Sequence, residues 1–595
     1  MRATFLIRAS LLVATLLIPS LALAQEAPLR VGPPAVETVA IPPPLRLAER
    51  ADAAPLASLA PALEQESARL AALALRNRQR QLPLQNGIAR DLPRLERLRI
   101  QPGAVQLSQR AAGGLLERTA EGRLVWGTEV RVADAWRLRL HLSAVALPPG
   151  SRLWVWGEQE TVGPFGLELK GPDGDLWTPS VGGNVIRLEV EMPASGGEAG
   201  FLVDRVLQLF ELDATGAAVT GQSVAGAPCL EDVQCINSSV FDVVDLAQAA
   251  IAHIQFIDGG SGFICSGGLL NDQASSGIPW FLTANHCFDN QSAASTLEAF
   301  FDFFSATCDG AAPSLGSLPR ASGSTLMATG SLGLGMSDYT FLRLSSVPGN
   351  RVFLGWNANT AVTTNGTTLH RISHPMGLKQ HYSQNHVDTG AITCSGAPRP
   401  TFIYATYDTG LGNRGGTFGG SSGSPLIRAG GQVVGQLTGG CGPNPSDGCD
   451  YDNADVDGAF ASTFPAVEPF LAGTGTGCVA NATTMCLVSD RFQIEINFNS
   501  GPPQNLAGDG MVVPLGSDNS GMFYFFAADN WEMLVKVLNA CPLNNRYWVF
   551  FAATTNVGFT LTVTDTDNGT AKTYTNPIGM AALPVQDTNA FATCP

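Results

Sequence analysis

Charged residues are scarce in this chain, since Asp, Glu, Lys and Arg together make up 14% of its 595 residues. The acidic residues outnumber the basic ones by 51 to 35, which gives a formal net charge of −16 at pH 7. A nucleic-acid partner or an anionic membrane surface would require a basic face, so this balance argues against both. Low charge combined with 65 glycines is typical of β-rich exported domains rather than of helical bundles.

Long apolar runs are also missing after the N-terminus. Arg2 and Arg8 precede the short apolar run 11–18, and Ala22-Leu23-Ala24 resembles a small-residue cleavage site. This run is too short to span a bilayer. The sequence therefore predicts a signal peptide over residues 1–24 and an exported protein that begins at Gln25, either extracellular or periplasmic.

Cysteine is absent before position 229, and twelve cysteines follow. An even number in an exported protein predicts up to six disulfides. No Cys-x2-Cys pair has a matching second pair, so a zinc site is disfavoured, and we expect neither a metal nor a cofactor. Cys478/Cys486 and Cys541/Cys594 are the expected local pairs; the wider connectivity stays open. The remaining cysteines are Cys229, Cys235, Cys265, Cys287, Cys308, Cys394, Cys441 and Cys449.

The residues before this first cysteine fall into two parts. Residues 25–87 are rich in Ala, Leu and Pro, and the spacing of leucines over 58–82 predicts one solvated helix. Residues 88–212 change to a period of two, as in Trp136–Leu142. Short strands separated by turns predict a β-sandwich here. The small-residue stretch 213–228 follows as a linker, which completes a unit over 88–228.

Two further units follow. Residues 229–472 contain ten or more short apolar strands and the first eight cysteines. A Gly-Thr linker over 473–477 then leads to residues 478–595, whose alternating strands predict a second sandwich of seven or eight strands. The aromatic residues Trp531, Tyr547 and Trp548 are candidates for a binding face of this module, although core packing is their more common role.

Three motifs in the 229–472 unit contain the residue types of a nucleophilic site. Gly419–Pro425, GGSSGSP, places Ser422 on a tight turn whose Gly420 and Ser422 N–H groups can converge on one point. TANHC ends an apolar strand at His286. SDYTFLRL places Asp338 at the head of another, where a buried carboxylate needs a partner such as an imidazole N–H. A disulfide between Cys265 and Cys287 would fix the backbone beside His286.

These motifs, in the order His, Asp, Ser, resemble those of the chymotrypsin/trypsin family of serine endopeptidases. Within that family, CSGGLLN, WFLTANHC, GWN and VVGQLTGG are similar to segments of bacterial lysyl endopeptidases, and Cys229 and Cys235 resemble the start of their mature chains. The resemblance covers about 229–472. It implies an all-β protein with a chymotrypsin-like double β-barrel, flanked by an N-terminal β-sandwich propeptide (zymogen) and a C-terminal β-sandwich module.

The resemblance also implies roles for the motif residues. His286 would be the general base, Asp338 would hold its tautomer, and Ser422 would attack the scissile carbonyl to give an acyl-enzyme. Gly420 and Ser422 would supply the oxyanion hole. Protein or peptide substrates are the expected partners, and the alternative is a secreted binding protein that keeps the fold without catalysis.

One position departs from the trypsin pattern. Trypsin has an aspartate directly before its nucleophile, which pairs with the new N-terminal amine on activation, whereas this chain has Ser421 there. That ion pair cannot form, so activation must work differently. Lysyl endopeptidases share this absence, and there a disulfide holds the N-terminal segment; Cys229 is the equivalent candidate here. The 25–228 segment could assist folding or block the cleft, and both alternatives stay open.

The resemblance also extends to the pocket that would select the substrate side chain. By resemblance, Asp455, three residues before Gly458, is the candidate base of a pocket for a Lys or Arg side chain, together with Thr438, Gly439 and Gly440. Thr438 stands where lysyl endopeptidases have a histidine. The loop 447–457 has five aspartates, so a solvated turn or a calcium-binding loop remains an alternative.

The arrangement of basic residues also bears on specificity. The chain has no Lys or Arg between Arg205 and Arg320, so an enzyme specific for basic residues could not cut its own junction near Cys229. A non-basic, small-apolar preference is therefore the second reading. The remaining histidines are interpreted as structural, with His374-Pro375 as a turn; the others considered are His253, His370, His381 and His386.

Overall fold

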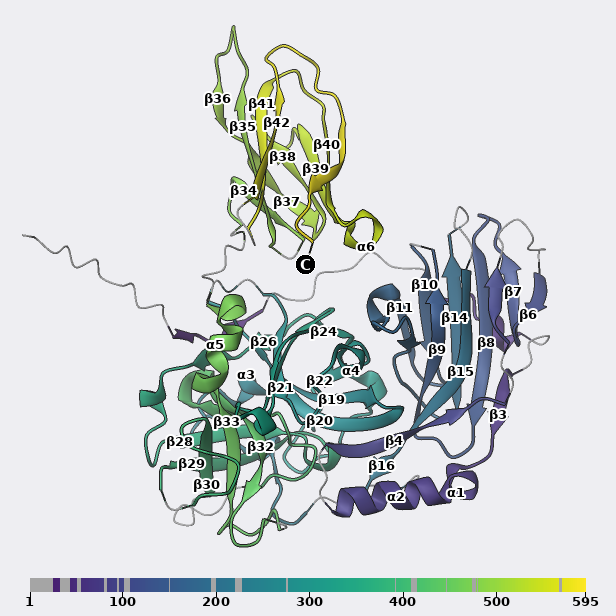
Figure 1. Ribbon diagram of the computed structural model, residues 1–595, viewed down its shortest axis with the longest axis vertical. Helices are drawn as coiled ribbons and strands as arrows, with labels where there is room; N and C mark the ends of the chain where they lie inside the picture. The colour runs from purple at the N-terminus through teal and green to yellow at the C-terminus, as the bar shows by residue number, and fades with distance from the viewer. Residues whose placement is uncertain are drawn as a thin grey trace, which may run out of the picture.

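The computed structural model describes most of the chain after residue 24. Its described residues are 25–32, 43–50, 55–79, 83–93, 96–100, 108–148, 150–193, 199–213, 215–219, 227–273, 275, 277–390, 392–407, 415–445, 447–472, 478, 480–488, 490–566 and 570–594. The expected signal peptide and the 473–477 linker lie outside these ranges. Strands dominate the described residues, as predicted, and three bodies are seen in Figure 1. No helix in these ranges is both long and apolar enough to cross a membrane.

The N-terminal body is a β-sandwich with its own core. One sheet has the order β11-β10-β14-β8-β7-β6, and β3 (Ala57–Leu59) pairs with β8 (Leu124–Val132). The facing sheet includes β9 (Arg137–Ala146) and β15 (Ala199–Leu209). The core between them includes Trp126, Leu140 and Phe201. The bounds of the other strands of the first sheet are Ser108–Ala111 (β6), Gly114–Arg118 (β7), Arg152–Trp156 (β10), Thr161–Phe165 (β11) and Val185–Met192 (β14).

The predicted helix is shorter than the leucine pattern suggested. The segment 58–82 divides into the end of β3, the short helix α1 (Ala62–Gln65) and the longer helix α2 (Ser67–Arg78). Helix α2 buries Leu70 and Leu73, which lie three residues apart on one face, while Leu75 is 55% exposed. The helix is therefore packed along one side rather than solvated all round, and it rests beside β4 (Figure 1).

Strand β4 (Leu84–Asp91) joins the sandwich to the next body. It pairs antiparallel with β15 on one edge and with β20 (Ser261–Leu270) on the other. The result is one continuous sheet of thirteen strands, whose main path begins at β12 (Leu176–Trp177) and has the order β12-β9-β15-β4-β20-β19-β22-β23. The sequence pattern predicted two separate β-domains here. Because β4 is hydrogen-bonded along both of its edges, the sandwich and the next body share one sheet, with no free strand edge between the two bodies.

A buried charge network accompanies this shared sheet. Glu298, on β22 (Glu298–Phe301), is fully buried and accepts hydrogen bonds from Ser180 N at 3.0 Å and from Arg320 Nη1 at 3.1 Å. Arg139 of the sandwich lies 3.6 Å from the same carboxylate. Burial raises the pKa of Glu298. The three neighbouring arginines and the Ser180 N–H lower it by more in total, so the pKa lies below its usual value. The contact between the two bodies is therefore electrostatic as well as hydrogen-bonded.

The central body holds two β-barrels of the chymotrypsin type. In the second barrel the pairing closes on itself in the order β28-β29-β30-β33-β32-β31 and back to β28. Their bounds are Thr368–Ser373 (β28), His381–Asp388 (β29), Phe402–Tyr407 (β30), Pro425–Arg428 (β31), Gln432–Cys441 (β32) and Ala454–Ala459 (β33).

The first barrel is more open. Two branches leave β20, one through β21 and β25 to β24, and the other through β19 and β22 to β23. Their bounds are Ile251–Asp258 (β19), Trp280–Ala284 (β21), Arg320–Ser322 (β23), Ser324–Gly330 (β24) and Tyr339–Leu344 (β25). Because β4 occupies the outer edge of β20, this barrel is extended by a strand from the N-terminal region.

The residues that follow position 24 also belong to the central body. Strand β1 (Glu26–Ala27) pairs with β27 (Gly355–Asn357), and β2 (Arg30–Val31) pairs with β26 (Val352–Phe353). Ala27 is 1% exposed and is part of the core between the barrels. The N-terminal region thus contacts the central body through β1 and β2 as well as through β4.

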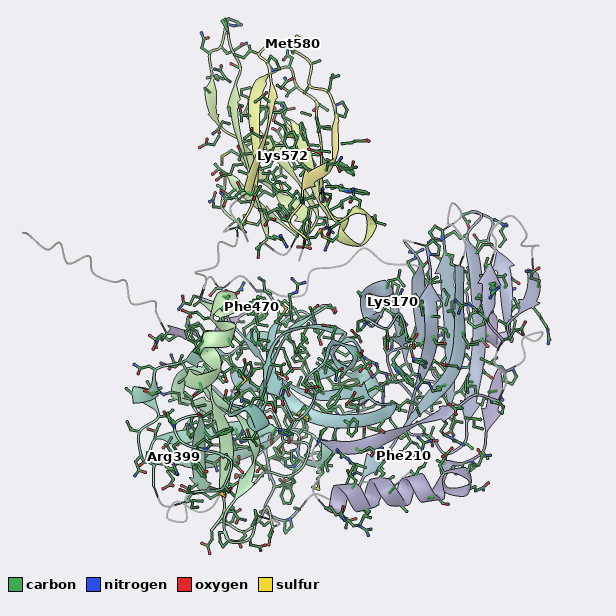
Figure 2. The ribbon with its side chains drawn as sticks, in the orientation of Figure 1. Lys170, Phe210, Arg399, Phe470, Lys572 and Met580 are labelled. Carbon is green, nitrogen blue, oxygen red and sulfur yellow. A yellow bond between two sulfur atoms is a disulfide. The ribbon has the colours of Figure 1, made fainter. Side chains whose placement is uncertain are left out.

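The C-terminal module is a sandwich of two five-stranded sheets, with orders β34-β35-β41-β42 plus β36, and β37-β38-β39-β40-β43. Its ten strands exceed the seven or eight expected, because short edge strands such as β36 (Ala507–Asp509) lack a strong alternating pattern. Tyr547 is in the core, whereas Trp531 is 46% exposed. Met580 lies at the end far from the central body (Figure 2). The remaining bounds are Thr484–Leu487 (β34), Phe492–Asn499 (β35), Met511–Ser517 (β37), Ser520–Tyr524 (β38), Met533–Asn539 (β39), Tyr547–Ala553 (β40), Gly558–Asp565 (β41), Thr570–Asn576 (β42) and Val585–Phe591 (β43).

Candidate active site

The site lies where the two barrels meet. His286 follows β21 and Asp338 precedes β25, two paired strands of the first barrel, while Ser422 lies on the turn before β31 of the second barrel. The three motifs of the sequence are therefore brought to one junction.

Asp338 makes two contacts with His286, one at the backbone N–H and one at the imidazole. The His286 backbone N–H donates to Asp338 Oδ1 at 2.9 Å, and Nδ1 lies 2.8 Å from Oδ2. The carboxylate is 1% exposed, and its backbone has the left-handed φ of +52°. Gln436 Nε2 of the second barrel donates to the Ser337 carbonyl at 2.6 Å. The contacts to Oδ2 and from the backbone fix the ring so that Nε2 is the atom available for proton transfer.

The Ser422 turn packs directly against the strand that leads to His286. Gly423 has a φ of +78°, and a Cβ there would lie 2.7 Å from the Ala284 backbone nitrogen. Only glycine allows this approach. Ser266 N also donates to the Ser422 carbonyl at 2.8 Å. The His286 Nε2 atom is buried and, within the described part of the chain, has no hydrogen-bond partner, so the Ser422 hydroxyl is not bonded to it in this conformation. Catalytic contacts often tighten only when substrate binds.

Two backbone N–H groups of the turn are oriented by the carbonyls beside them. The Gly419 carbonyl accepts from Met376 N at 2.6 Å, and the Ser421 carbonyl accepts from Ser424 N at 3.0 Å. Because the carbonyl and N–H of a trans peptide point in opposite directions, the N–H groups of Gly420 and Ser422 face away from these bonds.

Ser421 fills the position of the trypsin aspartate without any charge. It is fully buried, and its hydroxyl accepts a 3.0 Å hydrogen bond from Ser373. At this position the turn is thus held by a neutral contact, and a serine there cannot pair with an N-terminal amine.

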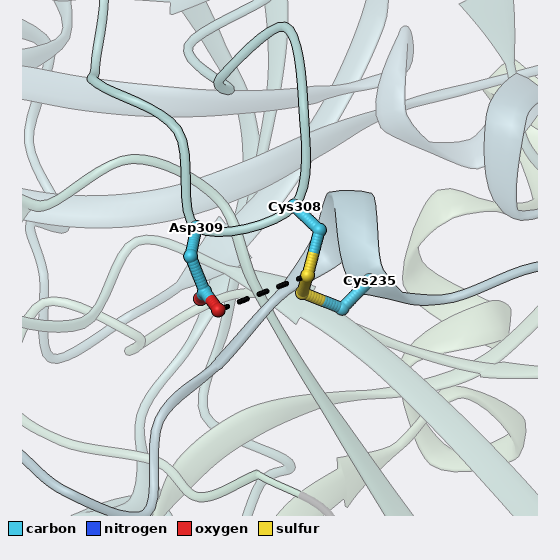
Figure 3. A group of neighbouring side chains, drawn as sticks. All are labelled: Cys235, Cys308 and Asp309. Carbon is cyan, nitrogen blue, oxygen red and sulfur yellow. Dashed lines mark hydrogen bonds between the residues drawn. A yellow bond between two sulfur atoms is a disulfide. The ribbon is translucent and has the colours of Figure 1, made fainter.

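The six disulfides join all twelve cysteines, and none is free. Cys265–Cys287 lies next to His286, and Cys229–Cys449 ties the start of the central body to the loop before β33. Figure 3 shows Cys235 and Cys308 beside Asp309; because these two cysteines form a disulfide, the group has no thiolate to offer a metal. The other pairs are Cys394–Cys441, Cys478–Cys486 and Cys541–Cys594.

A cavity of about 670 Å³ opens beside Ser422 and reaches Asp455. Gly439 and Gly440 line it, whereas Thr438 is not among the lining residues, although all three lie on β32. Asp455 is 2% exposed and accepts a 2.6 Å hydrogen bond from Thr417 Oγ1. Burial raises the pKa of Asp455, and Arg371 partly opposes this.

Residues that the sequence patterns did not single out surround this carboxylate. The Tyr407 hydroxyl lies 3.3 Å from both Asp455 oxygens, and Arg371 Nε lies 3.6 Å from Oδ2. They come from β30 and β28, and no motif marked them because their contacts depend on closure of the barrel. Asp447 and Asp450 of the same loop also line the cavity, and their carboxylates accept hydrogen bonds from nearby backbone N–H groups.

The N-terminal region covers the cavity. Asn77, Arg78, Leu84, Thr215 and Gly216 form part of its lining. Leu84 packs on Gly419, where a Cβ would lie 2.6 Å from the Leu84 Cγ. Ser422 is consequently only 3% exposed.

The other histidines of the central body do not line this cavity. Burial lowers the pKa of His253 to about 3 and that of His370 to about 4, so both are neutral at pH 7. His374 is fully buried and its Nδ1 lies 2.9 Å from the Leu378 carbonyl. His381 and His386 lie on β29.

The two barrels and the junction between them have a chymotrypsin-like arrangement. Residues 223–454 match the family profile described as "Lysyl endopeptidase, C-terminal domain". The lysyl endopeptidase of Pseudomonas aeruginosa is 29% identical over 323 residues, which is 52% of this chain and 65% of that protein's length. This region of the chain is accordingly similar to bacterial lysyl endopeptidases, as the sequence motifs predicted.

Solved structures of the Rv3671c protease of M. tuberculosis are also similar to part of the chain. The inactive form matches with 13% identity and a TM-score of 0.26, and covers 39% of this chain and 95% of the other. The active form matches with 14% identity and a TM-score of 0.27, and covers 43% and 95%. At these TM-scores we draw nothing further from them.

Removing the disulfide beside His286 should loosen the site. In the double variant Cys265→Ala/Cys287→Ala, a loop of 22 residues is no longer closed, and we expect a loss of roughly 3 kcal/mol in the stability of the protease domain. Thermal melting of the full chain measures this loss of stability. The rate at which a fluorophosphonate labels Ser422 measures the reactivity of the site. The matched control, Cys478→Ala/Cys486→Ala, should affect only the C-terminal module. Equal labelling and melting in wild type and the Cys265/Cys287 variant would show that this disulfide does not support the site.

Proposed function

We propose that the chain is an exported serine endopeptidase, made as a zymogen, that hydrolyses peptide bonds through an acyl-enzyme. The observation that supports this best is the double contact of Asp338 with His286 at the junction where the Ser422 turn packs. Six disulfides favour an oxidising compartment outside the cytosol.

In this proposal each residue has a defined role. His286 Nε2 takes the proton of the Ser422 hydroxyl as its oxygen attacks the scissile carbonyl, and later gives that proton to the leaving amine. Asp338 keeps the Nδ1–H tautomer and stabilises the imidazolium. The N–H groups of Gly420 and Ser422 stabilise the oxyanion; loss of one such donor in a related site costs about 3–4 kcal/mol.

Residues 25–228 would be the propeptide, and of the two roles left open, the contacts favour blocking of the cleft. Leu84 rests on Gly419, and Asn77 and Arg78 line the cavity. The pairing of β4 with β20 also supports a role in folding the first barrel. A short hairpin of β16 (Glu211–Leu212) and β17 (Ala218–Val219) encloses the start of the 213–228 linker, so cleavage would fall after it.

A cationic side chain is the substrate group that best fits the cavity. Its base is a buried carboxylate with two hydroxyl neighbours, Thr417 and Tyr407. We therefore propose cleavage after Lys or Arg, with Asp455 as the pocket base. Because no Lys or Arg lies between Arg205 and Arg320, the junction before Cys229 would need another protease.

The C-terminal module would serve attachment to a surface or polymer, or export, rather than catalysis. Its exposed residues Phe526, Trp531 and Met580 lie away from the cavity. A secreted binding protein that keeps the fold without catalysis is the alternative for the whole chain, and the contacts between Asp338 and His286 argue against it.

Replacing the nucleophile tests the enzymatic proposal. Ser422→Ala should lower the turnover of peptide substrates by roughly 10⁶-fold, because no acyl-enzyme can form. The fold should stay intact, as shown by thermal melting. The control is Ser345→Ala at an exposed position, which should retain full turnover. Residual peptidase activity near the wild-type level in purified Ser422→Ala protein would refute the assignment.

Replacing the pocket carboxylate tests the specificity. A peptide-library digest should show cleavage after Lys or Arg in wild type, and this preference should disappear in Asp455→Ser because the cationic side chain loses its partner. Asp452→Ser, an exposed aspartate of the same loop, is the control. Basic preference that survives Asp455→Ser rules out this residue, and a wild type that does not cut after Lys or Arg rules out the specificity.

A further inference from the structure

Arg371 lies in the second barrel beneath the cavity, with no exposed surface. Its Nη2 donates to both oxygens of Asp457, at 2.7 and 2.9 Å. Its Nε is a buried donor with no hydrogen-bond partner in the described ranges, and it lies 3.6 Å from Asp455 Oδ2. One guanidinium therefore stands between two buried carboxylates, and it is bonded to only one of them.

This buried group has more negative than positive charge. Two carboxylates face a single guanidinium, so the pairing of Arg371 with Asp457 leaves the charge of Asp455 without a full partner. A buried charge without a partner is costly, and a cation that enters the cavity would relieve this cost. If Asp457 were neutral, Arg371 would be free to pair with Asp455, and the cavity would no longer attract a cation.

The same guanidinium also contacts the nucleophile turn. Its Nη1 donates to the Ser424 carbonyl at 3.0 Å and lies 3.2 Å from the Ser424 hydroxyl. Ser424 is two residues after Ser422, and its N–H closes the turn onto the Ser421 carbonyl. The base of the cavity and the turn with Ser422 are thus fixed to one buried side chain.

We propose that Arg371, neutralised by Asp457, is the positioning residue that keeps Asp455 available for a cationic substrate side chain. The proposal rests on the proposed function, in which Asp455 is the base of the specificity pocket. It adds that the selectivity of Asp455 depends on Asp457, a residue that touches neither the substrate nor the cavity.

The first test is the variant Asp457→Asn, expressed as the full chain and assayed in its active, secreted form. KM for substrates with Lys or Arg should rise on the order of tenfold or more, because Arg371 then pairs with Asp455. KM for a neutral ester substrate should stay near the wild-type value. Active sites are counted by fluorophosphonate titration, and Asp452→Asn serves as the matched control.

The double variant Asp457→Asn/Arg371→Met separates charge from structure. Removing Arg371 leaves Asp455 unpaired again, so KM for basic substrates should return toward wild type. A purely structural role predicts the opposite, a double variant at least as poor as the single one. An unrecovered KM in the double variant, or an equal rise in KM for neutral and basic substrates in Asp457→Asn, would overturn the proposal.

The pH dependence of the wild-type enzyme gives a test without any variant. The groups that face this cluster are Arg371 from β28, Asp457 and Asp455 on β33, and Tyr407 from β30. Burial raises the pKa of Asp457 to about 6, which Arg371 partly opposes. Asp457 therefore takes up a proton as the pH falls through about 6. Burial also raises the pKa of Asp455, and protonation of either carboxylate should raise KM for basic substrates while KM for the neutral ester does not change.

A KM for basic substrates that does not change with pH in this range contradicts the proposal. Its failure is distinguishable from failure of the proposed function. A wild type that cleaves after Lys or Arg, with KM indifferent to Asp457→Asn, overturns only the role of Arg371. A wild type that never cleaves after basic residues overturns both.

Discussion

Strand β4 has hydrogen-bonded partners on both edges, and most of the arrangement depends on this double pairing. It makes one sheet out of the N-terminal sandwich and the first barrel. The same strand begins with Leu84, which lies on Gly419 of the Ser422 turn. Backbone pairing, rather than a specific side-chain lock, therefore positions the N-terminal region over the site. The buried Glu298 network strengthens the same interface.

The site itself depends on close contact between the barrels. The first barrel supplies the imidazole and the carboxylate that orients it, and the second supplies the Ser422 turn, with Gly423 allowing the approach. Where trypsin uses an ion pair beside its nucleophile, this chain has the neutral Ser421, and a buried Arg371 contacts the other side of the turn at Ser424. Order in the turn thus depends on contacts within the folded barrel, not on a newly formed chain end.

Much of the architecture was predictable from the sequence, because it is encoded locally. Period-two strands predicted the all-β class, and the resemblance of the three motifs to a known family implied the chymotrypsin-like fold. The motif residues do meet at one junction, although their roles stay predictions. The continuous sheet through β4 was missed because strand pairing across distant segments leaves no local pattern. Arg371 and Tyr407 were missed for the same reason, since each looks like an ordinary strand residue until the barrel closes around Asp455.

The central claim is that the N-terminal region covers a competent site. The most direct measurement is the rate at which a fluorophosphonate labels Ser422 in the purified full-length chain, compared with the same protein after cleavage in the 213–228 segment and release of the N-terminal region. We predict slow labelling of the intact chain, because Leu84 and its neighbours line the cavity that contains Ser422, and rapid labelling after release. Equally rapid labelling before and after release would contradict the account.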